Sequence, residues 1–223
     1  MNVVKNHNLE CSPIFLVELL HESSLVFLVG LEEAKDFSPY KVTMWSTSEN
    51  LVIYTSPKFN SKIQAIKLNK KRMLVLERNL LHIFNFSDMK IIHSLEVNNL
   101  STAHIVISHC IENDNIFCYS HFADQGLIKV YDLFSLYLKH TIRAHKSKVG
   151  RLSINHKGDM VASCSEKGTI IRIFSIITGD KLYTFKRGIS STIIYSMCFN
   201  KINNQILVTS ENGTVHLFLL EKK

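Results

Sequence analysis

The sequence predicts an all-β protein, a β-propeller of WD-repeat-like four-stranded blades with about five blades present. Three observations predict this class. Short strand-like segments ending in an aromatic residue recur at a nearly constant interval, and glycine turns occupy equivalent places in successive repeats. Helical periodicity is almost absent. We therefore expect residues 1–223 to form a single β-propeller domain.

The repeat is marked by aromatic residues at the ends of five apolar segments. The segments read VTMW, LHIF, IKVY, IRIF and VHLF, and they end at Trp45, Phe84, Tyr131, Phe174 and Phe218, in steps of 39, 47, 43 and 44 residues. Each is preceded by a run rich in β-branched or small residues. The first four are also followed by another short apolar run. Four short strands in about 40–45 residues is the pattern of a propeller blade.

Turn residues predict where the hairpins lie. EKGT (Glu166–Thr169) and ENGT (Glu211–Thr214) occupy equivalent places in two successive repeats, between the second and third strands. In both, glycine supplies the backbone freedom that a tight hairpin needs. The segment SIITGDKL places Gly179 in a further hairpin, between the third and fourth strands.

The most apolar segment runs from Ile14 to Leu31, and Glu18, His21 and Glu22 interrupt it. A membrane-spanning helix needs about 20 largely uncharged residues. We therefore interpret this segment as two buried strands joined by a polar turn. The N-terminus lacks a compact basic region followed by a clean apolar core, so a signal peptide is not expected.

The net charge and the cysteines indicate the kind of binding partner and the cellular compartment. The net charge of +7 and the pI of about 9.1 favour an anionic partner, such as nucleic acid, an acidic membrane or an acidic protein. A basic solvated surface without such a partner is the alternative. Five dispersed cysteines with no CxxC motif indicate reduced, mostly buried thiols and a cytoplasmic location. They are Cys11, Cys110, Cys118, Cys164 and Cys198.

The segment LYTFKRG carries two adjacent cations, Lys186 and Arg187, between an apolar strand and Gly188. Adjacent residues of an extended segment point to opposite sides, so each cation could serve a different anion. A dense anion with several phosphate oxygens needs cations for charge, and hydroxyl and imidazole groups for oriented hydrogen bonds. The neighbouring repeats contain such residues: His145, Ser163, Ser165, Thr169 and Arg172, then Ser210, Thr214 and His216.

Over nearly its whole length, from Ile14 to Leu220, the chain resembles the PROPPIN family of phosphoinositide-binding propellers, whose animal members are the WIPI proteins. The specific part of the resemblance is AHKSKVGRLSINHKGDMVASCSEKGTIIRIFSIITGDKLYTFKRG, followed by IIYSMCFN and SENGTVHLF. The family hallmark is a Phe- or Leu-Arg-Arg-Gly motif between two blades. Phe185, Lys186, Arg187 and Gly188 match it.

The resemblance implies two headgroup sites on one rim. The first contains His145, Ser163, Ser165, Gly168, Thr169, Arg172 and Lys186. The second contains Arg187, Gly188, Ser210, Thr214 and His216. Two weak sites would act together on a membrane through effective concentration.

The resemblance also implies a role. The protein would bind phosphatidylinositol 3-phosphate or the 3,5-bisphosphate as a peripheral membrane effector in autophagy and endolysosomal trafficking. It would sit on pre-autophagosomal, endosomal or vacuolar and lysosomal membranes. The family's loop for a lipid-transfer partner of autophagy corresponds to Glu32–Tyr40, where the residues diverge.

The match departs from the family in three ways. Lys186 replaces an arginine, which keeps the charge but loses the bidentate fork. The family's membrane-inserting loop follows the strand equivalent to VHLFLL, and this sequence ends before it. The family ring has seven blades, so the first and last are expected to be missing from this partial ring. Headgroup recognition is then expected to survive without the insertion.

Each candidate residue also has a structural interpretation. His145 in an Ala-His pair is a usual WD-repeat position, where the imidazole forms a hydrogen bond within the blade. Ser163 and Ser165 could be ordinary small strand residues, and Arg172 could extend from a buried strand to solvent. Taken together, with their spacing intact, these residues favour the binding function.

Other functions have less support. The sequence has no GxSxG, HExxH or phosphate-binding loop, and no metal-spaced Cys and His set, so we expect no enzyme, cofactor or metal. A protein-binding scaffold without lipid binding is the main alternative, because fold does not determine function. The basic cluster from Lys67 to Arg72 lacks interleaved aromatic residues and is interpreted as a solvated hairpin turn, so nucleic acid is not an expected partner.

Overall fold

The computed structural model describes residues 13–20, 23–33, 37–97, 105–108, 115–120 and 125–220. These residues form strands and turns and contain no helix, as the sequence predicts. Nothing in this described part is therefore a helix long and apolar enough to cross a membrane. The chain divides into two compact units, Met1–Glu96 and Val97–Lys223, and each is described by itself.

The first unit contains two antiparallel sheets of four strands, each with its strands in chain order. One sheet is formed by β1 (Ile14–Leu19), β2 (Leu25–Gly30), β3 (Thr43–Ser46) and β4 (Leu51–Thr55). The other is formed by β5 (Ala65–Leu68), β6 (Arg72–Leu76), β7 (Leu80–Asn85) and β8 (Lys90–Glu96). The Lys67–Arg72 cluster therefore lies at the β5–β6 hairpin, as predicted.

The second unit contains three antiparallel sheets. The first is formed by β9 (Ile105–Ile107), β10 (Ile116–Tyr119), β11 (Leu127–Asp132) and β12 (Tyr137–Arg143). The second is formed by β13 (Val149–Ile154), β14 (Met160–Ser165), β15 (Ile170–Ser175) and β16 (Lys181–Lys186). The third has three strands, β17 (Ile194–Phe199), β18 (Gln205–Ser210) and β19 (Val215–Leu219).

The hairpin glycines lie where the sequence predicts them. Gly168 joins β14 to β15 and Gly213 joins β18 to β19, with φ of 63° and 74°. Gly179 joins β15 to β16 with φ of 79°. L-amino acids with a Cβ atom rarely adopt this left-handed region, so glycine closes these turns without strain. At the turns equivalent to that of Gly179, the non-glycine residues Asn50, Met89 and Leu136 adopt it, with φ of 59°, 53° and 57°.

The prediction of two buried strands at Ile14–Leu31 is correct for the strands but wrong for the burial of β1. Leu16 packs against the core of the first unit, whereas Phe15, Val17 and Leu19 are exposed. Successive side chains of a strand point to opposite faces. Phe15, Val17 and Leu19 therefore share one face of β1, and the described residues leave them 48%, 56% and 63% exposed.

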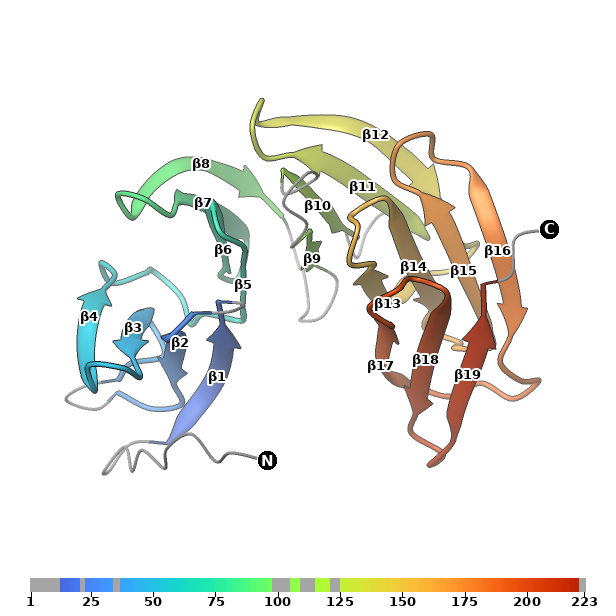
Figure 1. Cartoon of the computed structure of the whole chain (residues 1–223), viewed down its shortest axis with the longest axis horizontal. Coiled ribbons are helices and arrows are strands. Elements are labelled where there is room, and N and C mark those ends of the chain that lie inside the picture. The colour runs from blue at the N-terminus through green and yellow to red at the C-terminus, as the bar shows by residue number, and fades with distance from the viewer. Residues whose placement is uncertain are drawn as a thin grey trace. The chain divides into compact units, whose positions relative to one another are not determined.

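The three sheets of the second unit pack in chain order (Figure 1). Phe174 of β15 joins Ile142 and Val149 in a core between the β9–β12 and β13–β16 sheets. Ile171 and Ile173 of the same strand join Ile194 in a core between the β13–β16 and β17–β19 sheets. One face of β15 therefore packs toward the β9–β12 sheet and the other toward the β17–β19 sheet. A side chain of β15 can contact only the sheet on its own side.

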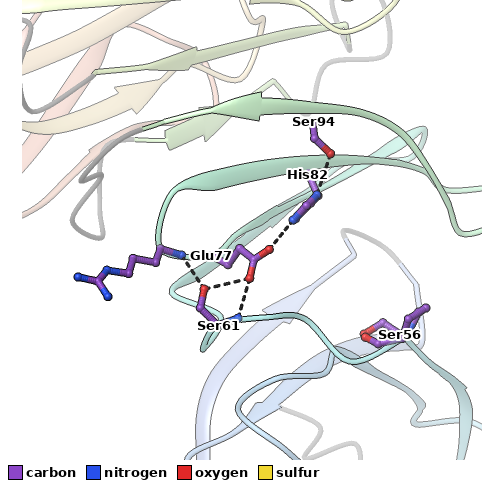
Figure 2. Close-up of polar contacts among 7 residues, drawn as sticks. Ser56, Ser61, Glu77, His82 and Ser94 are labelled. Atoms are coloured by element: carbon purple, nitrogen blue, oxygen red, sulfur yellow. Dashed lines mark hydrogen bonds and ion pairs between the residues drawn. The ribbon is translucent and has the colours of Figure 1, made fainter.

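A buried polar network stabilises the first unit (Figure 2). The carboxylate of Glu77 accepts hydrogen bonds from the Ser61 backbone N–H and hydroxyl at 2.8 and 2.9 Å. Its other oxygen lies 2.7 Å from His82 Nε2, and His82 Nδ1 lies 2.8 Å from the Ser94 hydroxyl. The network ties the β4–β5 connection to the turn after β6 and to the outer strand β8.

The described cysteines are free, in agreement with the sequence, but they are not all buried. Cys118 and Cys164 are buried and Cys198 is exposed. Burial raises the pKa of both buried thiols to about 12, so they remain protonated. Cys11 and Cys110 lie outside the described residues.

Candidate headgroup-binding site

The register of the β13–β16 sheet places several predicted residues on one face. Arg172 is paired with Ser163 on β14 and with Thr184 on β16, and Ile170 is paired with Lys186. Residues two apart on a strand share a face. Lys186 therefore shares a face with Arg172, and this face is turned toward the β9–β12 sheet because Phe174 packs there.

His145 is held by two predicted neighbours. Its Nε2 lies 2.9 Å from the Ser163 hydroxyl, and Arg172 Nη1 lies 3.2 Å from its Nδ1. Because arginine only donates, Nδ1 must accept, and Nε2 carries the proton and donates to Ser163. Burial, followed by the charge of Arg172, lowers the pKa of His145 to about 4. His145 is therefore neutral at pH 7 and positions Arg172 without adding charge.

Arg172 is anchored through one end of its guanidinium. Nη1 also donates to the Ala144 carbonyl at 2.7 Å. Among the described residues, Nε and Nη2 have no hydrogen-bond partner. The side chain is thus fixed in position while donors remain available, and a guanidinium held in this way suits a phosphate or carboxylate ligand.

A pocket of about 530 Å³ lies beside Arg172, between the β9–β12 and β13–β16 sheets. Its lining contains two predicted residues, His145 and Arg172, with Ile142 and Phe174 as apolar wall. Its other lining residues are Gln125, Arg143, Ala144, Lys146, Gly179, Asp180 and Lys181. The pocket is therefore rich in basic side chains and has one carboxylate.

Sequence reasoning missed the three further cations of this pocket, Arg143, Lys146 and Lys181. The segment IRAHK, in which Arg143 and Lys146 flank His145, is the signal that could have found two of them. Lys181 had no such signal, because its position opposite Phe174 depends on the β15–β16 register.

Other members of the predicted first site lie outside the pocket lining. Ser163 is fully buried, and its hydroxyl forms a hydrogen bond with His145. Ser165 is buried, and its carbonyl accepts from Gly168 N–H at 2.9 Å to close the turn. Thr169 is half-buried, and its carbonyl accepts from Arg187 N–H at 2.8 Å. The exposed Lys186 lies at the other end of β16 from Lys181.

Arg187 is buried, with 7% of its surface exposed. Its Nε donates to the Gly168 carbonyl at 3.0 Å, and its Nη2 donates to the Ser190 carbonyl. Gly188 donates weakly to the Thr169 carbonyl at 3.4 Å, and a Cβ atom at this position would meet nothing within 4 Å. The two cations of the hallmark motif thus have different environments, one exposed and one held by backbone carbonyls.

The other residues predicted for the second site form a separate cluster. The Ser210 and Thr214 hydroxyls are 2.8 Å apart, and His216 Nε2 lies 3.1 Å from the Thr214 hydroxyl. Asn212, which sequence reasoning missed, accepts from both hydroxyls at 2.7 and 2.8 Å. Within the described part of the chain, none of these four residues has a hydrogen bond to Arg187.

Comparisons with known proteins identify the relatives. A sequence model of the PROPPIN family matches residues 2–223. Autophagy-related protein 18 of Komagataella pastoris is 31% identical over 245 residues, covering 94% of this chain and 45% of the relative. WD repeat domain phosphoinositide-interacting protein 2 of Mus musculus is 33% identical over 217 residues, covering 95% and 47%. The chain spans about half the length of these curated relatives.

Solved structures give the same fold. Kluyveromyces lactis Hsv2 matches with a TM-score of 0.78 at 21% identity, covering 94% of this chain and 62% of that chain. A complex of KlAtg21 with the coiled-coil of AgAtg16 matches with a TM-score of 0.80 at 25% identity, covering 93% and 67%.

The fold and its similarity to these solved structures define an all-β protein with five blades of a β-propeller. The last blade has three described strands. This confirms the predicted fold class. The full family ring of seven blades stays an expectation, since the described residues form five sheets. The chain belongs to the PROPPIN family, as the sequence motifs indicated.

Proposed function

We propose that this protein binds phosphatidylinositol 3-phosphate, the 3,5-bisphosphate or both, as a non-enzymatic peripheral membrane effector in autophagy and endolysosomal trafficking. The observation that carries the proposal is Arg172, which is anchored through Nη1 and lies in a basic pocket with donors still available. A relative named for phosphoinositide interaction and relatives named for autophagy support it.

The proposed first site contains His145, Arg172 and Lys186 as its polar elements, supported by Ser163, Ser165, Gly168 and Thr169. The proposed second site contains Arg187, Gly188, Ser210, Thr214 and His216. Charge-assisted hydrogen bonds to phosphate contribute about 1.5–3 kcal/mol each. The sites would act at pre-autophagosomal, endosomal or vacuolar and lysosomal membranes, where two weak contacts add through effective concentration.

The test is co-sedimentation with liposomes at near-physiological salt. The vesicles would contain no phosphoinositide, the 3-phosphate, the 4-phosphate or the 3,5-bisphosphate. The variants would be Arg172→Gln, Lys186→Thr and Arg187→Thr, with Arg78→Gln as the matched control. Arg78 is exposed, and its side chain makes no hydrogen bond or ion pair with the described residues.

Selective sedimentation with the 3-phosphorylated lipids, lost in Arg172→Gln and kept in Arg78→Gln, would support headgroup recognition. Equal weak binding to every anionic vesicle, unchanged in all variants, would contradict it and leave only attraction to a basic surface.

A protein scaffold without lipid binding is the second candidate. It is favoured by the structural likeness to KlAtg21, which was solved with the coiled-coil of AgAtg16. A lipid-transfer partner, which the resemblance implies for Glu32–Tyr40, belongs to this candidate too, although residues 34–36 lie outside the described part. Retained partner binding with no lipid selectivity would support the scaffold.

A further inference from the structure

An exposed isoleucine directly follows the hallmark motif. Ile189 comes one residue after Gly188, in the connection between β16 and β17, and 89% of its surface is exposed. This is the largest exposed fraction among the exposed large hydrophobic residues of the described chain. Ile189 belongs to neither of the two hydrophobic cores of the second unit described above. Its side chain therefore does not contribute to the packing of these sheets.

The backbone of this connection is fixed between two turns that carry predicted site residues. On one side, Thr192 N–H donates to the Lys167 carbonyl of the β14–β15 turn at 3.1 Å. On the other side, Glu211 N–H of the β18–β19 turn donates to the Ile193 carbonyl at 2.9 Å. The connection therefore lies between the turns of the two proposed headgroup sites, with its isoleucine exposed there.

The segments that surround this connection are basic. The connections 144–148 and 187–193 and the turns 166–169 and 211–214 lie at one end of the β13–β16 and β17–β19 sheets, because all of them join strands at that end. Besides the buried Arg187, these segments and the last residue of β16 carry four lysines and two glutamates: Lys146, Lys148, Lys167, Lys186, Glu166 and Glu211. A basic end of this kind is complementary to an anionic lipid surface.

The connection itself has no charge after Arg187. Residues 188–193 are glycine, hydroxyl residues and two isoleucines, of which Ile193 is also exposed, at 55%. No charged side chain of this segment would have to lose its hydration if the segment entered the boundary between lipid headgroups and acyl chains. An apolar side chain beside cations is the combination that binds this boundary.

We propose that Ile189 enters the membrane interface when the neighbouring sites bind a phosphoinositide headgroup. The hallmark connection then provides an apolar contact as well as charge. This inference rests on the proposed function. The partner is a lipid surface, whose phosphates meet Lys186 and the surrounding lysines while the isoleucine leaves water. Burial of this side chain strengthens binding to a vesicle, and a soluble headgroup cannot reproduce that contribution.

The experiment compares two ligands of the whole chain. One is vesicles of phosphatidylcholine and phosphatidylserine, with and without phosphatidylinositol 3-phosphate. The other is inositol 1,3-bisphosphate, the soluble headgroup, measured by calorimetry. The main variant is Ile189→Ser, and Ile189→Leu keeps an apolar side chain. Ile202→Ser is the matched control, because Ile202 is 72% exposed beside the exposed Lys201, in the β17–β18 turn at the opposite end of β17.

We expect Ile189→Ser to weaken binding to the 3-phosphate vesicles about five- to twentyfold, because an apolar contact with lipid is lost. Its affinity for the soluble headgroup should stay within about twofold of the wild type, because no charge is removed. Ile189→Leu should retain most of the vesicle binding, and Ile202→Ser should change neither measurement. The melting temperatures of all variants should be close to that of the wild type, since both positions are exposed.

Tryptophan fluorescence tests insertion directly. Ile189→Trp and Ile202→Trp each add one tryptophan to a chain that already contains Trp45, so the background is the same in both. With 3-phosphate vesicles, the emission of Ile189→Trp should shift to shorter wavelength and be quenched by brominated lipids. The emission of Ile202→Trp should not change.

The inference and the proposed function can fail separately. Selective headgroup binding with unchanged vesicle binding in Ile189→Ser, and no quenching at position 189, would overturn the inference and leave this residue to a protein partner. Equal losses in the two serine variants would also overturn it, because any exposed isoleucine would then have the same effect. If the wild type binds neither the headgroup nor the vesicles selectively, the proposed function fails and the inference fails with it.

Discussion

Arg187 Nε donates a hydrogen bond of 3.0 Å to the backbone carbonyl of Gly168, the residue that turns β14 into β15. A second nitrogen of the same guanidinium donates to the Ser190 carbonyl. The arginine of the hallmark motif therefore joins the β14–β15 turn to the connection between β16 and β17. Two of its five N–H donors are thus used by backbone carbonyls, and Nη1 has no hydrogen-bond partner among the described residues.

Arg187→Thr should lower the free energy of unfolding by about 1–3 kcal/mol, because the buried Gly168 carbonyl and the Ser190 carbonyl lose a charged donor. Lys186→Thr should change it by less than about 0.5 kcal/mol, because Lys186 is exposed and has no described partner. Urea unfolding followed by circular dichroism measures both. Equal losses in the two variants would contradict the structural role of Arg187.

Gly168→Ala should be strongly destabilising and Gly188→Ala nearly neutral. Gly168 has φ of 63°, and a Cβ atom there would lie 2.2 Å from the Thr192 carbonyl oxygen. At Gly188 a Cβ atom would meet nothing within 4 Å, and its φ is not in the left-handed region. Melting temperatures of the two variants give the comparison. A stable Gly168→Ala protein would show that this turn has another conformation.

Ser163→Ala should lower the free energy of unfolding by about 1–3 kcal/mol, since it leaves the buried Nε2–H of His145 without an acceptor. Ser153→Ala is the matched control. Ser153 is also a buried strand serine, but its hydroxyl has no side-chain partner in the described residues. Chemical denaturation of both variants tests this. A similar cost at both positions would mean that the His145 contact contributes little.

The neutrality of His145 makes stability depend on pH. Its folded pKa is about 4, below the ordinary value of 6.5. As the pH falls from 6.5 to 4, the unfolded chain binds a proton at this residue and the folded chain does not. The free energy of unfolding should therefore fall with decreasing pH in this window, at most about 1.4 kcal/mol per pH unit, and be unaffected by His145 above it.

Unfolding of the wild type and His145→Gln at several pH values between 4.5 and 7.5 isolates this effect. Glutamine does not titrate, so the variant should show a shallower slope even if it is less stable throughout. Identical slopes would mean that His145 is accessible and protonated in the folded protein.

Glu77→Ala should lower the free energy of unfolding of the first unit by about 2–4 kcal/mol, because the Ser61 N–H and His82 lose their common acceptor. Burial opposes ionisation of Glu77, but hydrogen bonds from His82 and Ser61 outweigh it and lower the pKa of the carboxyl. Its stabilising effect is therefore fully present above 4.5, the ordinary pKa of a glutamate, and is lost as the pH falls below that value.

Hydrogen exchange at residues 56–64, compared between wild type and Glu77→Ala, would locate the effect. Faster exchange confined to this segment and the turn after β6 is the expected outcome. Unchanged protection there would show that the network in Figure 2 does not hold the β4–β5 connection.

Hairpins and strand positions could be predicted from short-range signals. Gly168, Gly179 and Gly213 lie where turn residues predicted them, because a left-handed turn depends on local backbone freedom. The exposure of β1 could not be predicted from its apolar residues, because burial depends on whether another layer covers a face.

The candidate binding site, too, could be predicted from the sequence only in part. The contact of His145 with Ser163 and Arg172 joins residues whose types and spacing had singled them out. The motif could not show that Arg187 is held by carbonyls, because that depends on where the Ser190 segment folds back. Nor could it show that Lys181 and Arg143 line the same pocket.

The sequence by itself was enough to predict the repeat and the turns, because each depends on neighbours along one or two strands. Its motifs also indicated the family and the residue types that could bind an anion. Packing of one sheet on the next decided which cations share a pocket. Arg143 and Lys181 lie on different sheets and meet only across their interface, and the two faces of β15 determine which side chains open into it.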